Sequence, residues 1–221
     1  QKPTKLFTTN RSVEAINESE LQQLSGTPTT FTATDEARAE GGWKEEWLLE
    51  ELQKNCMAGR TISLKVGAQV MLLQRLKDTK LMNGSRGVVT GFATVEAMGG
   101  LAFPIVKFEA MGRNGRETEV TVKPVCFEMR TVGKGWVCRT QVPLKLAWAC
   151  TVHKSQGLSL SHMEVDLSGC FAPGQAYTAL SRARSTTGLK VLPGFRPKCV
   201  RCCEKVSRFY GFEADPGVQG A

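Results

Sequence analysis

Hydrophobic residues recur along the chain first at helical spacing and then, beyond about residue 60, in short strand-like runs. At the N-terminal end, "PTKLFTTNRSVEAINESELQQLSG" predicts a strand at Leu6 and Phe7, followed by a helix. The apolar face of that helix consists of Val13, Ile16, Leu21 and Leu24. A second helix is predicted in "WKEEWLLEELQKN", because Trp43, Trp47, Leu48 and Leu52 fall on one side of it.

Short runs rich in β-branched and aromatic residues extend from about Thr61 to Val142. They are "TISLKVGAQVMLLQRL", "RGVVTGF", "FPIVKFEA", "TEVTVKPVCFEM" and "GWVCRTQV". Turn residues stand between them at Asn83-Gly84, Gly99-Gly100 and Asn114-Gly115. Evenly spaced short strands with tight turns predict a small closed β-barrel.

The pattern of an α/β domain returns at Pro143. "AWACTV", "MEVDL" and "GLKVLPGF" indicate strands, and "GQAYTALSRARS" indicates a helix. The expected fold is therefore one α/β domain in two segments, residues 1–60 and 143–221, interrupted by the barrel at residues 61–142.

Composition adds a preference for a polyanionic partner. The 221 residues include 29 basic and 21 acidic side chains, a formal charge of +8, and the basic residues gather between Arg182 and Arg208. No apolar run reaches the roughly 18 residues of a membrane span, so no membrane partner is expected. The chain begins at Gln1 instead of methionine, which favours a piece of a longer protein.

The eight cysteines show no framework spacing, which favours a reduced, intracellular protein with thiols that are exposed or half-buried. One C-x-x-C occurs, at Cys199 and Cys202, but no second pair stands nearby. A zinc site needs four ligands, so no metal site is predicted.

The chemistry-bearing segment is "TVHKSQGLSL", which starts at Thr151 at the end of a predicted strand. Ligands of open α/β sheets bind at such ends, and Gly157 lets backbone amides approach a phosphate. The alternative is a capped loop that satisfies its own backbone, and the segment alone favours that alternative.

"AYTALSRAR" follows about twenty residues later and adds Arg182 and Arg184. On a helix, residues two apart point in different directions, so one arginine can face a cleft while the other stays in water. An arginine in a cleft can neutralise a transferring phosphoryl group. A pair of solvated arginines near a helix C-terminus is the alternative.

"TVHKSQGLSL" followed by "GQAYTALSRAR" resembles motifs five and six of superfamily-one helicases, in the wording of the Pif1 family and its RecD relatives. "LKVGAQVMLLQRL" with "LMNGSRGVVTGF" is similar to the start of that family's Src-homology-three-like barrel. "PTKLFTTNRSVEAINESELQQLSG" resembles its motif four region, and "PLKLAWACTVHKSQG" its return from barrel to core. The resemblance covers nearly the whole chain.

The resemblance implies the second RecA-like domain of an ATP-dependent 5′-to-3′ DNA helicase. ATP with Mg²⁺ would lie between this domain and a first RecA-like domain that carries the phosphate loop and holds most of the magnesium. The sequence contains no G-x-x-x-x-G-K-[ST], and "VGKGW" lacks the upstream glycine and the following Ser or Thr. The chain alone is therefore expected to be inactive.

The resemblance also assigns roles to individual residues. Arg182 would be the arginine finger, and Gln156 and Gly157 would line the nucleotide. The residues implied to lie toward single-stranded DNA are Thr151, His153, Lys154 and Ser155, of which Lys154 could serve either ligand. Those of the motif four region are Asn10, Arg11 and Asn17. Gln175 and Tyr177 would support motif six, although core packing is an alternative for Tyr177.

The implied partners are single-stranded and forked DNA and the first RecA-like domain of the same protein. On the barrel, candidates for additional positive charge are Lys107, Arg113, Arg116 and Lys123, with a solvated surface as the alternative. The resemblance implies a location in the nucleus or the mitochondrion. An alternative function is a non-catalytic helicase remnant that acts as a nucleic-acid-binding or assembly module.

Overall fold

The computed structural model describes residues 2–77, 79–96, 99–109 and 117–211, and the chain divides into two compact units. Unit 1 comprises Asn17–Trp148, and unit 2 comprises Lys2–Ile16 together with Ala149–Ala221. The division falls inside helix α1 (Asn10–Gln23) and again just before strand β12 (Ala149–Thr151).

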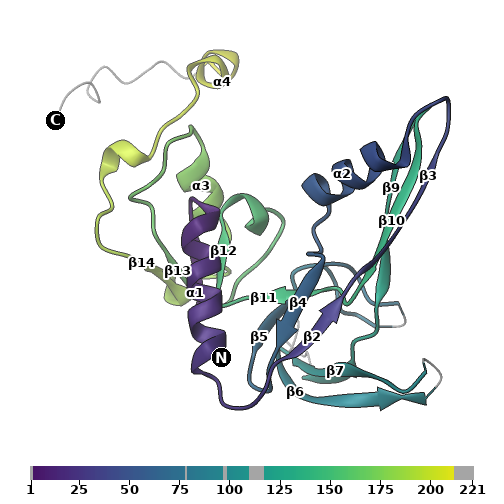
Figure 1. Cartoon of the computed structure of the whole chain (residues 1–221). Coiled ribbons are helices and arrows are strands. Elements are labelled where there is room, and N and C mark those ends of the chain that lie inside the picture. The colour runs from purple at the N-terminus through teal and green to yellow at the C-terminus, as the bar shows by residue number, and fades with distance from the viewer. Residues whose placement is uncertain (1, 78, 97–98, 110–116, 212–221) are drawn as a thin grey trace. The chain divides into compact units, whose positions relative to one another are not determined.

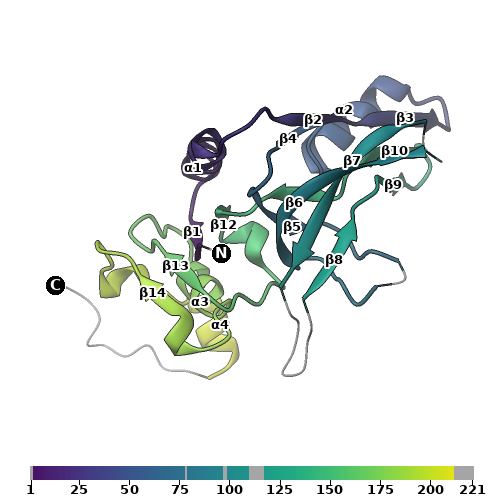
Figure 2. The same cartoon turned by 90° about the horizontal axis from the view of Figure 1, so that it is seen from below.

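Unit 2 is built on a parallel sheet of four strands in the order β12-β1-β13-β14 (Figures 1 and 2). The strands besides β12 are β1 (Thr4–Phe7), β13 (Met163–Val165) and β14 (Leu189–Val191). Lys5 of β1 lies beside Ala149 of β12 and Glu164 of β13. This arrangement confirms the predicted α/β fold class.

Short helices complete unit 2 around this sheet. They are the 3-10 helices η2 (His153–Ser155), η3 (Thr186–Gly188) and η4 (Pro197–Cys199), and the α-helices α3 (Gln175–Leu180) and α4 (Glu204–Phe209). Ala176 and Ala179 of α3 are buried, whereas α4 buries no residue.

Unit 1 is centred on an antiparallel sheet in the order β11-β5-β6-β7-β8. Its strands are β5 (Gln69–Leu72), β6 (Arg86–Val95), β7 (Leu101–Phe108), β8 (Thr118–Thr121) and β11 (Leu144–Leu146). Figure 2 shows β6 and β7 side by side along their length. The core that this sheet encloses includes Leu64, Val70, Leu72, Val89, Val106, Phe108, Val142 and Trp148.

Two further sheets belong to unit 1. One pairs β2 (Thr29–Thr32) with β4 (Thr61–Leu64), and the other has the order β3-β10-β9. The strands of the latter are β3 (Thr34–Ala39), β9 (Val125–Thr131) and β10 (Gly135–Gln141). Helix α2 (Glu45–Asn55) packs Leu48 and Leu52 against Val137 of β10. Strands β2 and β3 were not predicted from the sequence.

The strands between Thr61 and Val142 therefore belong to three sheets instead of one ladder. Phe31 of β2 and Ile62 of β4 nevertheless pack against the same core as the five-stranded sheet, so the arrangement is barrel-like. Gly84 and the Gly99-Gly100 pair adopt positive φ in turns, as predicted. Asn114-Gly115 lies outside the described residues.

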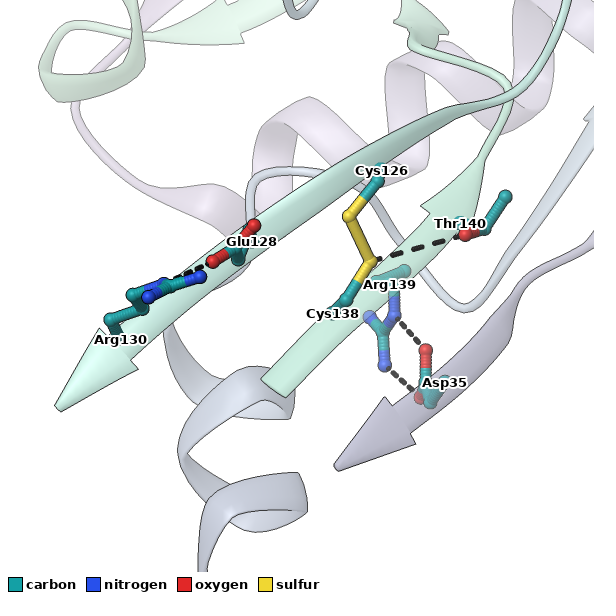
Figure 3. The surroundings of a disulfide bond; sticks show 7 residues. All are labelled: Asp35, Cys126, Glu128, Arg130, Cys138, Arg139 and Thr140. Carbon is teal, nitrogen blue, oxygen red and sulfur yellow. Dashed lines mark hydrogen bonds and ion pairs between the residues drawn. A yellow bond between two sulfur atoms is a disulfide. The ribbon is translucent and has the colours of Figure 1, made fainter. Parts of the chain in front are cut away.

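A disulfide joins Cys126 of β9 to Cys138 of β10, so the expectation of thiols throughout is wrong for this pair (Figure 3). Cys126 lies opposite Thr140 and Cys138 opposite Glu128, which makes the cysteines diagonal neighbours with Cα atoms 6.0 Å apart. The pairing depends on strand register, which the 12-residue spacing does not reveal. The other six cysteines, all within the described residues, are not part of a disulfide.

The domain bounds stay a prediction. The compact units of the structure have different bounds. Residues 17–60, predicted to belong to the sheet domain, lie in unit 1 together with the barrel-like sheets. Among the helices of the described ranges, none has the length and apolar character required to cross a bilayer.

Candidate functional site

The segment after β12 forms a tight turn that uses its own polar groups. The Thr151 hydroxyl, on a residue only 4% exposed, accepts a hydrogen bond from the Lys154 N–H at 3.3 Å. The Ser155 hydroxyl is 0% exposed and donates to the Val152 carbonyl at 2.7 Å. For these two hydroxyls the structure agrees with the alternative of a capped loop, because both bond to the backbone of the turn.

The turn nevertheless exposes several of its residues. His153, Lys154, Gln156 and Gly157 are exposed, while Leu158 is buried and anchors the end of the turn. Gly157 has a φ of +77°, a left-handed conformation that favours glycine, and a Cβ there would meet nothing within 4 Å. The glycine is therefore required by the backbone conformation, and the space above it stays open.

Arg182 lies against the end of this turn, although the two segments are distant in the sequence. The Leu160 N–H donates to the Arg182 carbonyl at 2.8 Å, and the Arg184 N–H donates to the Leu160 carbonyl at 2.9 Å. The Arg182 guanidinium donates to the carbonyls of Thr178 and Leu158, at 2.9 and 3.4 Å, and to the Ser181 hydroxyl at 2.9 Å. The structure thus brings together the two segments singled out in the sequence.

The helix predicted to include both arginines is shorter than expected. Helix α3 ends at Leu180, and Ala183 forms a parallel bridge with Leu160. Contrary to the prediction, Arg182 and Arg184 therefore lie not on the helix but in the segment that this bridge holds. The two still differ, since Arg182 is half-buried and Arg184 is exposed.

The residues proposed to support motif six have opposite environments. Gln175 is buried, and its Oε1 accepts hydrogen bonds from the N–H groups of Phe171 and Ala172 at 3.0 and 3.3 Å. It therefore holds the loop that precedes α3. Tyr177 is 74% exposed, which excludes core packing as its role in this unit.

The motif four residues lie on or at the start of α1. Asn10 is exposed and follows β1 closely, whereas Asn17 is buried. The side chain of Arg11 lies outside the described part of the structure.

The basic candidates of unit 1 are described only in part. Lys107 contacts Glu117 at 2.6 Å, and this hydrogen bond raises the pKa of the Lys107 ammonium. Lys123 is exposed, whereas Arg113 and Arg116 lie outside the described residues. Lys107 therefore has a local counter-charge that the sequence analysis did not anticipate. Within the described ranges, no group of three or more metal-ligating side chains lies close enough to hold a metal ion.

Known proteins resemble this chain over most of its length. The family "DNA helicase Pif1, 2B domain" matches residues 47–92. The rat protein "ATP-dependent DNA helicase PIF1" is 41% identical over 208 residues, which are 94% of this chain and 30% of the rat protein. The chain thus spans less than a third of that relative.

Solved structures agree with this similarity. The Pif1 helicase from Candida albicans superimposes with a TM-score of 0.79 at 32% identity, over 96% of this chain and 49% of the Candida chain. Pif1 from Bacteroides "in complex with ADP-AlF3 and ssDNA" has the same fold, with a TM-score of 0.61 at 24% identity, over 94% of this chain and 44% of that one. From this agreement in sequence and in fold, the chain belongs to the Pif1 family of helicases.

Proposed function

We propose that this chain is the C-terminal half of an ATP-dependent 5′-to-3′ DNA helicase, in which it supplies the arginine finger and part of the track for single-stranded DNA. The observation that carries the proposal is the hydrogen bonding of Arg182 to the segment that follows the exposed turn. The names of the relatives, which are ATP-dependent DNA helicases, support it.

Arg182 fits the role of a finger by its position and its donors. Its guanidinium carries five N–H donors, and its three hydrogen bonds are to neutral oxygens of Thr178, Leu158 and Ser181. A phosphoryl oxygen is a stronger acceptor, so the same donors can turn to stabilise negative charge on a transferring phosphoryl group. Bound ATP would supply that group, and the exposed Gln156 and Gly157 would line its site.

The turn fits a contact with a nucleic-acid backbone. His153 and Lys154 are exposed and offer an imidazole and an ammonium to phosphates and sugars. Thr151 and Ser155 are buried, so their part in the track is to hold the shape of the turn. Because Leu158 and Leu160 connect this turn to Arg182, both ligands would act on one loop.

The other groups of the ATP site would belong to the longer protein. The first RecA-like domain of the same protein would hold most of the Mg²⁺ and the β- and γ-phosphates, since this sequence contains no phosphate loop. The purified chain should therefore release no phosphate from ATP above background, with or without single-stranded DNA. Turnover by the chain alone would contradict this division of roles.

The test in the longer protein is steady-state ATP hydrolysis at saturating single-stranded DNA. Arg182→Ala should lower the rate by a factor on the order of 10³, because the finger stabilises transition-state charge. Arg182→Lys should recover little of it, since an ammonium lacks the guanidinium fork. Arg184→Ala is the matched control and should be milder.

Binding of single-stranded DNA without nucleotide should survive all three substitutions. Near-normal hydrolysis by Arg182→Ala, with loss in Arg184→Ala, would show that Arg184 is the finger. No effect of either would show that neither arginine is the finger, and an unsubstituted longer protein that hydrolyses no ATP would favour the helicase remnant. Unwinding of duplexes with a 5′ or a 3′ single-stranded tail tests direction, and only the 5′-tailed and forked substrates should be unwound.

A further inference from the structure

Unit 2 contains a hollow of about 770 Å³ beside the ends of β13 and β14. We name it the C-terminal hollow. Its lining includes Ser168, Cys170, Gly194, Arg196, Lys198 and Arg201. Strands β13 and β14 are parallel neighbours, and both run into segments that line it. Its volume lies within the roughly 300–1,000 Å³ of small-molecule sites, and the carboxyl ends of parallel strands are where such sites form.

The lining is strongly basic. Arg196, Lys198 and Arg201 contribute three positive charges, and no carboxylate is part of the lining. Within the described residues, Arg196 and Lys198 are exposed and take part in no ion pair. The nearby carboxylate of Asp166 already accepts hydrogen bonds from the N–H and the hydroxyl of Ser168, at 2.9 and 2.6 Å.

The thiol of Cys170 does not offset this charge. It is 6% exposed, and burial raises the pKa of the Cys170 thiol. The sign follows because desolvation disfavours the thiolate, so the thiol stays neutral at neutral pH. The hollow therefore keeps its positive charge across the neutral range.

The backbone that presents the cations is held in place. The Gly174 N–H donates to the Arg201 carbonyl at 2.9 Å, and the Arg201 guanidinium donates to the Cys170 carbonyl at 3.5 Å. In η4, the Cys199 N–H donates to the Arg196 carbonyl at 2.8 Å. The charges thus project from an ordered turn, and ordering before binding lowers the entropy cost of binding.

Gly194 keeps one wall of the hollow thin. It adopts a φ of +98°, and a Cβ at this position would lie 3.3 Å from the Cβ of Ser168. The bare backbone therefore leaves room that a side chain would reduce.

We propose that the C-terminal hollow is a phosphate-binding site, which takes a phosphate group from a nucleic-acid strand or from a free nucleotide through Arg196, Lys198 and Arg201. Planar guanidinium groups match phosphate oxygens two at a time, and a lysine adds a point charge. The site includes neither Arg182 nor a residue of the turn at 151–157. Its test is therefore independent of the test of the proposed helicase role.

The experiment records backbone amide NMR shifts of the purified chain with three probes, which are inorganic phosphate, thymidine monophosphate and a short oligothymidylate. The amides of Ser168, Gly194 and Val200 should shift on binding. R196A/K198A should weaken binding at the hollow about tenfold or more, since hydrogen bonds to charged groups are lost. K205A/R208A is the matched control, because it removes one lysine and one arginine from exposed positions on α4 outside the hollow.

Tighter binding of the oligothymidylate than of the monophosphate identifies a strand as the source, and equal binding identifies a free nucleotide. The proposal is overturned if none of the three probes shifts the lining amides. It is also overturned if the two double variants weaken binding equally, since net charge alone would then explain the effect. Unchanged amide shifts of Leu6 and Val165 in each variant establish that the sheet of unit 2 is intact.

Discussion

Arg139 of β10 and Asp35 of β3 are joined by two parallel hydrogen bonds, from Nε to Oδ1 and from Nη2 to Oδ2, each 2.8 Å long (Figure 3). The Arg139 side chain is only 2% exposed, and it also donates to the Ala58 carbonyl and to Gln53 Oε1. This buried guanidinium ties the three-stranded sheet to α2 and to the segment that follows α2.

Removing the acid from this pair should destabilise unit 1 strongly. Asp35→Ala leaves a buried guanidinium without its counter-charge, and such losses cost about 3–5 kcal/mol. The double variant Asp35→Ala with Arg139→Met should recover part of the loss, because it removes the unpaired charge as well. Urea unfolding of each variant measures the free energies.

Glu128→Ala is the control for that comparison. It breaks the ion pair of Glu128 with Arg130, which lies on the exposed face of the same sheet, and should leave stability unchanged. Equal losses in Asp35→Ala and Glu128→Ala would contradict the buried pair as the source of stability.

The same pair predicts how stability depends on pH. Hydrogen bonding to Arg139 holds the pKa of the Asp35 carboxyl below its ordinary value. A carboxyl whose pKa is lowered in the folded state stabilises the fold above its unfolded pKa of about 3.9, and that contribution is lost as the pH falls through the folded pKa. The stability difference between the wild type and Asp35→Asn should therefore shrink as urea unfolding is repeated at decreasing pH below about 4. A difference that stays constant down to the lowest pH would contradict the linkage.

The disulfide predicts the chemical state and the stability of the hairpin of β9 and β10. Alkylation of the denatured, unreduced chain should modify six cysteines, and alkylation after reduction should modify all eight. A closed loop of this size favours the folded state by about 2–3 kcal/mol through the unfolded chain's lost entropy. Cys126→Ser with Cys138→Ser should lose about that amount, and eight modified cysteines without reduction would contradict the bond.

The exposed turn predicts a salt dependence of binding to single-stranded DNA. If about three phosphates are contacted, the logarithm of affinity should fall against the logarithm of salt concentration with a slope of roughly −2. Lys154→Ala should reduce that slope by about 0.7, because one phosphate contact is lost. Lys44→Ala removes the same charge from an exposed position in unit 1 and serves as the control. An affinity that does not vary with salt concentration would contradict binding through the phosphates of the DNA.

The parallel sheet was predictable in part because buried apolar residues mark its inner strands β1 and β13. Leu6 and Val165, for example, are both fully buried, as is typical of parallel strands. Strands β2 and β3 were missed because Thr29–Ala39 contains a single large apolar residue, Phe31, although its threonines favour strands. The sequence does alternate charged Glu36 and Arg38 with Ala37 and Ala39. The structure shows the same alternation as exposed and half-buried positions along β3.

The site was predictable in its residue types but not in their exposure. A serine hydroxyl can serve a ligand or its own backbone, and for Ser155 the turn geometry decides in favour of the Val152 carbonyl. Likewise, the end of α3 before Arg182 follows from the bridge between Leu160 and Ala183, a contact between distant segments that helix propensity does not contain. The cations of the C-terminal hollow were visible only as a basic stretch.

The position of β1 at the middle of the unit 2 sheet has a consequence for synthesis on the ribosome. Both neighbours of β1 follow the whole of unit 1 in the sequence, since Lys5 pairs with Ala149 and with Glu164. At about 5–20 residues per second, the nascent β1 waits on the order of ten seconds before a partner strand exists. Unit 1 is complete on the ribosome before this sheet can form, so a defect in the folding of unit 1 is expected to delay the assembly of the sheet of unit 2.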